Sequence, residues 1–218
     1  MADAATKLGQ VWVVAPDSER SAMSHSVTLR REVEVWEVPF PVEKVKAFAC
    51  DGKPADCVRV GVLNIVVPKP DMVFSGINYG YNVAADLQYS ATVGAAFEAA
   101  FQECHAIAFS EGAREIHEVA DDYLLDIMKE LADKPLARGQ IWNVNFPACT
   151  RSECKGIAYN TTVSADGFYK DRYKETVLSN GRRSYMVDGI RNWDAQAGTD
   201  LRAVIDNYIS VGVAHNIS

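Results

Sequence analysis

Residues 70–82 read PDMVFSGINYGYN, a short apolar run that passes directly into small and amide side chains. The run at 71–75 is typical of a buried strand. The stretch at 74–82 holds two glycines, two asparagines and a serine, and no charge. Glycines let the backbone approach a ligand closely, and amides offer neutral contacts at fixed places. The pattern predicts a loop at a strand end that serves either as a binding loop or as a tight turn.

Strands and helices alternate on both sides of this stretch. The first ten residues resemble the tail of a helix that closes on Gly9. Apolar runs predict strands at 11–15, 46–50, 106–110 and 141–146. Helical spacing predicts helices that start near residue 55, at Ser90 and at Ile116. This order indicates an α/β fold, a Rossmann-like, doubly wound and mostly parallel sheet.

Two segments indicate antiparallel β structure outside this alternation. Residues 27–38 alternate between apolar and polar, which predicts an exposed strand or hairpin arm. From Lys155 onward, short β-like pieces alternate with polar turns and aromatic residues. We therefore expect a Rossmann-like core at 1–150. Residues 151–218 are expected to form an antiparallel extension and a C-terminal segment that oligomerises.

Composition limits the partners of the 218-residue chain. Its net charge of −7 argues against a nucleic-acid polymer as the main partner, although a helix terminus can still bind a small anion. The five cysteines form no C-x-x-C pair, which favours free thiols in a reducing compartment over a disulfide framework. We see no signal peptide or long apolar span, so we expect a cytoplasmic protein without a membrane partner.

Three polar loops follow predicted strands, at residues 16–26, 51–56 and 75–89. In an open parallel sheet, ligands bind beyond the carboxyl ends of the strands. Ser90 and Thr92 open the next helix, where free backbone N–H groups and the helix dipole favour a phosphate. The alternative is that Ser90 is only an N-cap and Thr92 an ordinary first-turn residue.

The other two loops are ambiguous by themselves. Ser21 is either an oxygen ligand for a hard cation or an ordinary loop serine. Asp51 and Asp56 could each accept a ribose hydroxyl or cap the helix from residue 55. We expect Asp51 to cap that helix or make a turn, and Asp56 to favour the helix N-terminus electrostatically. A serine triad is disfavoured, because there is no G-x-S-x-G motif and because Ser24 and His25 are adjacent.

Five blocks together resemble the SurE (survival protein E) family over nearly the whole chain. They read VVAPDSERSAMSHSVTL, CDGKPADCV, PDMVFSGINYGYN, YSATVGAAFEA and GTDLRAVIDNYIS. The resemblance implies a metal-dependent phosphatase that hydrolyses nucleoside 5′-monophosphates. It also implies one Mg²⁺ or Mn²⁺ per chain. A homodimer or homotetramer built by exchange of arms or C-terminal segments is implied as well.

The resemblance also assigns residues to roles. Ser21 and Asn78 match the family's metal ligands. The phosphate-binding set that it implies comprises Gly76, Asn82, Ser90, Ala91 and Thr92, and the catalytic residues among them are Asn82, Ser90 and Thr92. Ala91 stands where many members have glycine, and its backbone N–H can still donate. We identify no general acid for the leaving group.

One departure from the family is at the front of the chain. The family opens with an apolar strand and an N-D-D-G motif that supplies charged metal ligands, and no Asp-Asp-Gly occurs here. A missing central strand would remove about 6–12 kcal/mol of apolar burial, comparable with the ~5–15 kcal/mol stability of a native domain. We therefore expect a further segment ahead of Ala2, which an intact mass above that of the 218 residues would reveal.

Two other functions stay open if that motif is truly absent. One is a nucleotide-binding or phosphate-binding protein that has lost the metal and does not turn its ligand over. The other is a catalytically silent oligomeric scaffold, which would neither bind nor hydrolyse nucleotides.

Overall fold

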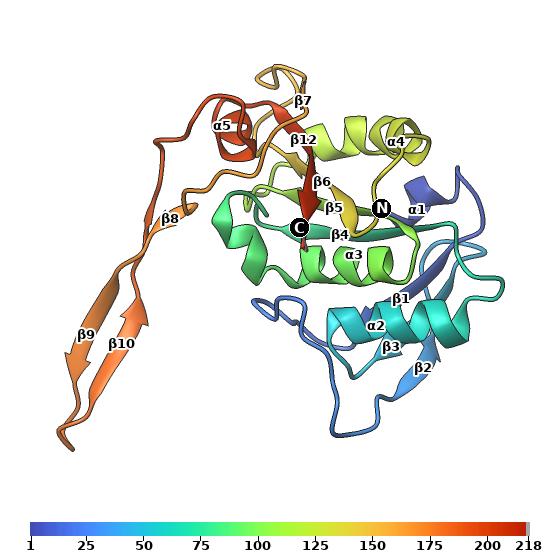
Figure 1. Cartoon of the computed structure of the whole chain (residues 1–218), viewed down its shortest axis with the longest axis horizontal. Coiled ribbons are helices and arrows are strands. Elements are labelled where there is room, and N and C mark those ends of the chain that lie inside the picture. Colours follow the sequence, from blue (N-terminus) through green and yellow to red (C-terminus); the bar gives the residue numbers. More distant parts are fainter. Residues whose placement is uncertain (217–218) are drawn as a thin grey trace.

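The structure is a computed structural model that describes residues 1–216. Its core is a five-stranded sheet in the order β4-β5-β6-β12-β7 (Figure 1). The strands are β4 (Met72–Tyr79), β5 (His105–Glu111), β6 (Gln140–Phe146), β7 (Ile157–Tyr159) and β12 (Ile209–His215). The strands β4, β5 and β6 pair in parallel, and β12 pairs antiparallel with β6 and parallel with β7.

A second, three-stranded sheet has the order β1-β3-β2. Its strands are β1 (Trp12–Pro16), β2 (Val35–Val38) and β3 (Lys46–Cys50). Here β1 pairs in parallel with β3, and β2 pairs antiparallel with β3. The expected Rossmann-like, mostly parallel fold is confirmed, but the sheet is divided between β1 and β4.

Helices cover both faces of these sheets. They are α1 (Ala2–Ala5), α2 (Pro54–Val60), α3 (Ala91–Phe101), α4 (Glu118–Ala132) and α5 (Asp200–Ile205), with a π-helical turn η1 (Gly61–Ile65) and a 3-10 turn η2 (Ala85–Tyr89). The expected helix starts near residue 55 and at Ser90 are confirmed, whereas α4 begins two residues after Ile116.

Successive side chains of β5 point to opposite faces of the sheet, which explains the two layers of the core. Ile107 and Phe109 pack in one cluster with the apolar stripe of α4, which includes Leu124, Ile127, Met128 and Leu131. Ala106 and Ala108 point the other way and pack in a second cluster with the alanines of α3. Small side chains on both sides let α3 lie close to the sheet, which fixes its N-terminus near the ends of the strands.

Two strand boundaries differ from the expected ones. Only Val35–Val38 of the alternating stretch 27–38 forms a strand, because the preceding residues are held by loop contacts described below. β4 continues to Tyr79, beyond the expected end at residue 75, with a register shift between Ser75 and Asn78. Residues 74–79 of the FSGINYGYN stretch therefore belong to the irregular end of β4.

Residues beyond 150 contribute both to the core and to a protruding arm. β12 lies inside the core sheet, so a cut at residue 150 would divide that sheet. The arm consists of β8 (Tyr169–Lys170) paired with β11 (Ile190–Arg191) and of β9 (Tyr173–Val177) paired with β10 (Arg183–Val187). Figure 1 shows β9 and β10 extending away from the rest of the chain. Antiparallel pairing beyond residue 150 occurs within the arm and between β12 and β6.

The cysteines are the thiols that the absence of a C-x-x-C pair favours. All five cysteines are free thiols, and four of them are buried. Within residues 1–216, no helix combines the length and the apolar character needed to cross a membrane.

Candidate functional site

The irregular end of β4 requires glycine at position 76. Gly76 has φ +124°, and a Cβ there would lie 2.2 Å from the carbonyl oxygen of Phe109. Both facts exclude an ordinary side chain. The register of β4 against β5 shifts between Ser75 and Asn78, so Asn78 pairs with Ser110 of β5.

Asn78 links the end of β4 to the start of α3. Its Nδ2 donates to the carbonyl of Gly80 at 2.8 Å, and its Oδ1 accepts from the hydroxyl of Thr92 at 3.3 Å. Gly76 and Thr92 also line one cavity. The structure therefore brings together Gly76, Asn78 and Thr92 from the predicted site.

The N-terminus of α3 is built as expected around Ser90. The Ser90 hydroxyl accepts from the N–H of Val93 at 3.2 Å, so Ser90 is an N-cap. Within the described residues, the N–H groups of Ala91 and Thr92 have no hydrogen-bond partner. Free N–H groups at a helix N-terminus and the positive end of the helix dipole favour a bound anion.

Asn82 lies in a buried polar network. Its Nδ2 donates to the Ser110 hydroxyl at 2.7 Å, and its backbone N–H donates to Oδ1 of Asn145 at 2.8 Å. The side chains of Asn143 and Asn145 donate in turn to the Asn82 carbonyl. These contacts fasten the loop after β4 to β5 and β6, which gives Asn82 a positioning role in this structure.

Ser21 is exposed and donates to the Glu19 carboxylate at 2.7 Å. The loop that carries it is fixed against the start of α3 by Ser24. The Ser24 N–H donates to Tyr89 and its hydroxyl donates to Gln88. A Cβ on Gly94 would lie 2.3 Å from the Ser24 carbonyl oxygen, so α3 and this loop are in close contact.

The acidic residues of the third loop act as anchors. Asp56 is buried and accepts from the N–H and hydroxyl of Thr28 and from the N–H of Lys53. Asp51 accepts from the guanidinium of Arg31 and from the N–H of Glu34. Asp56 therefore lies at the N-terminus of α2 as expected, whereas the Asp51 side chain bonds to Arg31 and Glu34 and not to that helix.

Replacement of Asp56 by asparagine is expected to destabilise the fold in a pH-dependent way. Burial alone would raise the pKa of Asp56, but the hydrogen bonds from Thr28 and Lys53 hold it below the ordinary 3.8. The ionised carboxylate therefore stabilises the fold above that value, and this contribution is lost as the pH falls through the lower folded pKa. Near pH 7 we expect a loss of about 1–3 kcal/mol in the free energy of unfolding.

Urea unfolding of wild type and Asp56→Asn at pH 7 and at acidic pH measures this effect. The difference between the two proteins should shrink on acidification. Asp171→Asn, in the exposed arm, is the matched control and should show no such difference. A constant difference across this range would contradict the role of the Asp56 charge.

Two polar features were missed by sequence reasoning. His25 binds the buried Glu98 of α3 at 2.9 Å, which leaves Ser24 without a histidine base and agrees with the rejection of a serine triad. The signal in the sequence was Glu98, a lone charged residue in the alanine-rich segment of α3, which suggests a buried partner. Asn143 and Asn145 share one face of the apolar strand IWNVNF, and that spacing could have predicted the network around Asn82.

The described residues do not fit a divalent cation. Ser21 and Asn78 bring no formal charge, and hard cations are normally held with carboxylate help. Within residues 1–216, no three of the His, Cys, Asp and Glu side chains cluster as a metal site. The carboxylates nearest to Ser21 along the chain are Asp17 and Glu19. Asp17 accepts a hydrogen bond from Arg20, and Glu19 accepts one from Ser21.

The mostly parallel sheet and its covering helices define the chain as a Rossmann-like α/β protein. Its candidate site lies at the carboxyl edge of the sheet, where the strands end beside the N-terminus of α3. The crystal structure of the SurE protein from Aquifex aeolicus matches it with a TM-score of 0.83 at 33% identity. That match covers 100% of this chain and 87% of the other.

Sequence comparison gives the family. A family model described as survival protein SurE matches residues 1–169. The 5′-nucleotidase SurE of Clostridium botulinum (strain 657 / Type Ba4) is 33% identical, over 99% of this chain and 86% of that protein. The 5′-nucleotidase SurE of Desulforamulus reducens is 36% identical, over 96% of this chain and 83% of that protein. The chain belongs to the SurE family.

Proposed function

We propose that this chain is a 5′-nucleotidase that hydrolyses nucleoside 5′-monophosphates to nucleoside and phosphate. The observation that carries the proposal is the junction of β4 and α3, where Asn78 and Thr92 lie beside the N–H groups of Ala91 and Thr92. Relatives named 5′-nucleotidase SurE favour an enzyme over a binding protein or a scaffold.

The chain's own groups hold the phosphate in this proposal. The N–H groups of Ala91 and Thr92 bind oxygens of the phosphoryl group, and the helix dipole favours the charge that develops on them. The Thr92 hydroxyl turns from Asn78 to the phosphate, while Asn78 remains fixed by Gly80. Because the two backbone N–H donors are in place before the substrate binds, they need little reorganisation during the reaction.

A requirement for one Mg²⁺ or Mn²⁺ per chain stays a prediction from the family resemblance. The uncharged pair Ser21 and Asn78 does not fit such an ion by itself, so no catalytic step is assigned to one. The proposed cytoplasmic location is supported by the five free thiols.

Release of phosphate and nucleoside from AMP and GMP tests the proposal. The assay is run with Mg²⁺, with Mn²⁺ and with a chelator. We expect equal amounts of the two products. Chelator-sensitive release would establish the metal requirement. Binding of AMP without turnover would support the phosphate-binding alternative, and neither binding nor turnover would support the scaffold.

We also propose a homodimer or homotetramer that forms through the arm. On one face of the β9–β10 hairpin, Tyr173 lies opposite Val187 and Glu175 lies opposite Tyr185. Tyr173, Tyr185 and Val187 are more than half exposed. A two-stranded hairpin is marginally stable alone, and such an apolar face is typical of an interface. A second copy of the chain is the partner that we propose.

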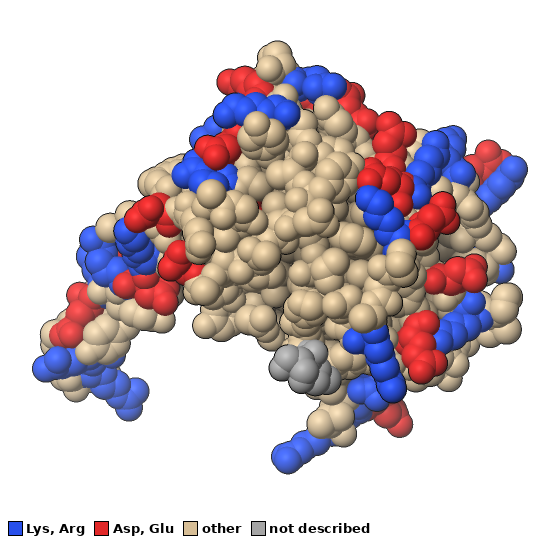
Figure 2. Space-filling model, turned by 45° about the horizontal axis from the view of Figure 1, so that its top comes forward, with Lys and Arg blue, Asp and Glu red and all other residues tan. Residues whose placement is uncertain are grey.

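Charged side chains of both signs are mixed on the face that Figure 2 shows. On the face shown, Lys and Arg side chains are interspersed with Asp and Glu around an uncharged central area. On this face, the basic residues do not form a single stripe of the kind that binds a nucleic-acid backbone.

Replacement of Tyr185 by glutamate is expected to dissociate the oligomer. In the interface, the new carboxylate would lose its water and would lie opposite Glu175. Desolvation and the repulsion between the two carboxylates would both weaken association. Light scattering coupled to size-exclusion chromatography should show a reduced mass. Thr176→Glu, on the opposite face of the hairpin, is the control and should keep the wild-type mass. A wild type that is already monomeric, or equal behaviour of both variants, would contradict the interface.

A further inference from the structure

The loop after β1 covers one face of α3. Ser90, Gly94 and Glu98 are spaced four residues apart, so they lie on the same face of the helix. The two residues Ser24 and His25 cross this face at Gly94. A Cβ on Gly94 would lie 2.3 Å from the Ser24 carbonyl oxygen and 2.9 Å from Cα of His25. Glycine at this position therefore lets the two residues, which we call the strap, lie directly against the helix.

Ser24 ties the strap to the start of α3. The Ser24 N–H donates to the Tyr89 carbonyl at 3.0 Å, and the Ser24 hydroxyl donates to the Gln88 carbonyl at 2.6 Å. Tyr89 directly precedes the N-cap Ser90. These two hydrogen bonds therefore fix the point at which the helix begins.

His25 ties the strap to the middle of α3. Its Nε2 lies 2.9 Å from Oε2 of Glu98, and its Nδ1 lies 3.1 Å from the side-chain nitrogen of Asn216. An amide nitrogen can only donate, so Nδ1 accepts and Nε2 carries the proton that is donated to Glu98. The His25 ring also packs against Phe101, with 5.2 Å between the ring centroids. Contacts on three sides thus hold the imidazole in one orientation.

Glu98 requires this hydrogen bond because it is buried. Only 5% of the residue is exposed, and a buried carboxylate is costly unless its oxygens have partners. Its Oε1 accepts from the side-chain amide of Gln102 at 2.9 Å and lies 3.6 Å from Nε of Arg59. Among the described residues, the partner of Oε2 is His25. Release of the strap would therefore leave half of a buried carboxylate unpaired.

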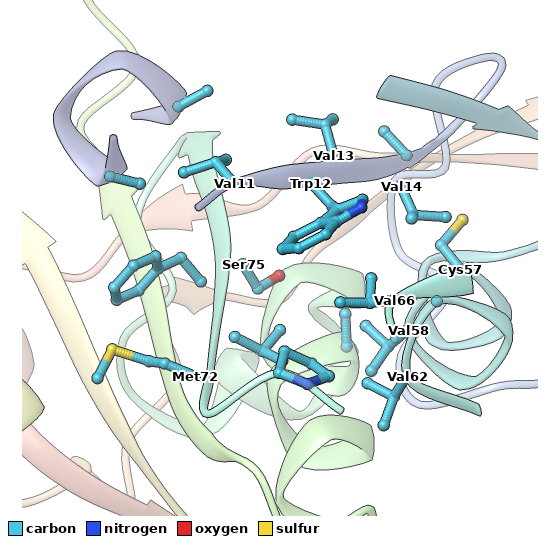
Figure 3. Close-up of a pocket in the computed structure, with 18 of the residues that line it drawn as sticks. Val11, Trp12, Val13, Val14, Cys57, Val58, Val62, Val66, Met72 and Ser75 are labelled. Carbon is cyan, nitrogen blue, oxygen red and sulfur yellow. The ribbon is translucent and has the colours of Figure 1, made fainter. Parts of the chain in front are cut away.

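The strap and the cavity between β1 and β4 touch different residues of α3. Figure 3 shows Val58 and Ser75 beside this cavity, which has a volume of about 710 Å³ and reaches α3 at Thr92 and Ala95. Within the described residues, the strap lies outside the lining of the cavity. The contacts of the strap therefore do not depend on what the cavity contains.

We propose that His25 is a positioning residue of the phosphate site. Through its hydrogen bond to Glu98 it keeps the strap across α3. The strap in turn holds the start of the helix, where the N–H groups of Ala91 and Thr92 bind the phosphoryl group. The effect of His25 on catalysis rests on the proposed 5′-nucleotidase function, whereas its hold on the strap does not.

Two replacements of His25 separate its hydrogen bond from its bulk. His25→Leu keeps an apolar side chain beside Phe101 but cannot donate to Glu98. It should lower kcat for AMP by at least about tenfold and change KM by less than about threefold, because displaced donors act mainly on the transition state. His25→Gln supplies an amide N–H in place of the imidazole N–H and should recover most of the wild-type kcat.

Backbone ¹⁵N order parameters test the strap without any assay of activity. In His25→Leu, the order parameter of the Ser24 amide should fall from about 0.85 to below about 0.6, while that of Ile107 in β5 stays at the wild-type value. His25→Gln should keep Ser24 rigid. A loss of overall stability would leave both order parameters of the folded protein unchanged, so this measurement isolates the strap.

Gly94→Ala provides a second route to the same result if His25→Leu does not fold. Its Cβ would push the strap away, whereas alanine favours the helix and the side chains of His25 and Glu98 are kept. It should loosen Ser24 and lower kcat as His25→Leu does, and the double variant should lose little more, because both changes act through one contact.

The outcomes also distinguish this inference from the proposed function. A rigid Ser24 in both His25→Leu and Gly94→Ala would overturn the inference, as would a kcat in His25→Leu equal to that of wild type. Failure of the wild-type protein to release phosphate from AMP would overturn the proposed function, and the order parameters would then decide by themselves whether His25 holds the strap.

Discussion

Replacing Gly76 by alanine is expected to lower the free energy of unfolding by about 2–5 kcal/mol and to abolish most nucleotidase activity. The new Cβ would lie 2.2 Å from the backbone carbonyl of Phe109, in the middle of a buried strand that cannot move aside. It would also hold an L side chain at φ +124°. Relief of the clash has to displace the end of β4, and Asn78 moves with it.

Gly80→Ala is the matched control for this prediction. Gly80 has nearly the same φ, +125°, but its Cβ would meet only the side-chain nitrogen of Asn78, at 3.7 Å. It should therefore lose about 1–2 kcal/mol through backbone strain alone. Urea unfolding followed by circular dichroism measures both losses. Equal losses in the two variants would mean that the approach of Gly76 to β5 is unimportant.

Removal of the Asn78 side chain is expected to give the largest loss of activity without unfolding. Asn78→Ala should lower kcat/KM for AMP by about 10²–10³, as is typical when one preorganised polar group at a charged transition state is lost. Its two hydrogen bonds are local, so the free energy of unfolding should fall by no more than about 1–2 kcal/mol.

Two variants separate the role of Asn78 from a general effect on the loop. Tyr79→Phe changes the next residue, whose exposed hydroxyl contacts Glu115, and should retain activity. Thr92→Val removes the hydroxyl that donates to Asn78 and should lower kcat/KM less than Asn78→Ala does. Wild-type activity in Asn78→Ala would exclude Asn78 from the site.

The features that sequence reasoning predicted well are local ones. Ser90 was recognised as an N-cap because capping depends on a few neighbouring residues. The placement of the loops after β1 and β4 followed from strand and helix alternation, which fixes the carboxyl edge of a parallel sheet.

The features that escaped prediction depend on contacts distant in sequence. The buried network around Asn82 was not predicted, because its partners Ser110 and Asn145 lie 28 and 63 residues away in sequence. The expected contact of Asn82 with the phosphate stays a prediction. Similarly, β12 pairs with β6 across the whole arm, and no local pattern in residues 209–215 indicates that partner. The placement of β1 and β4 in two different sheets also depends on how the strands assemble, so local sequence does not predict it.

The measurement that tests the central claim most directly is the response of backbone amides to AMP, followed by NMR of the ¹⁵N-labelled protein. If the phosphoryl group binds at the N-terminus of α3, the largest shifts will fall on Ala91, Thr92 and the Asn78 side chain, and they will be lost in Asn78→Ala. Shifts centred on another surface, such as the groove lined by Arg30 and Arg31, with none at Ala91 and Thr92, would contradict the account.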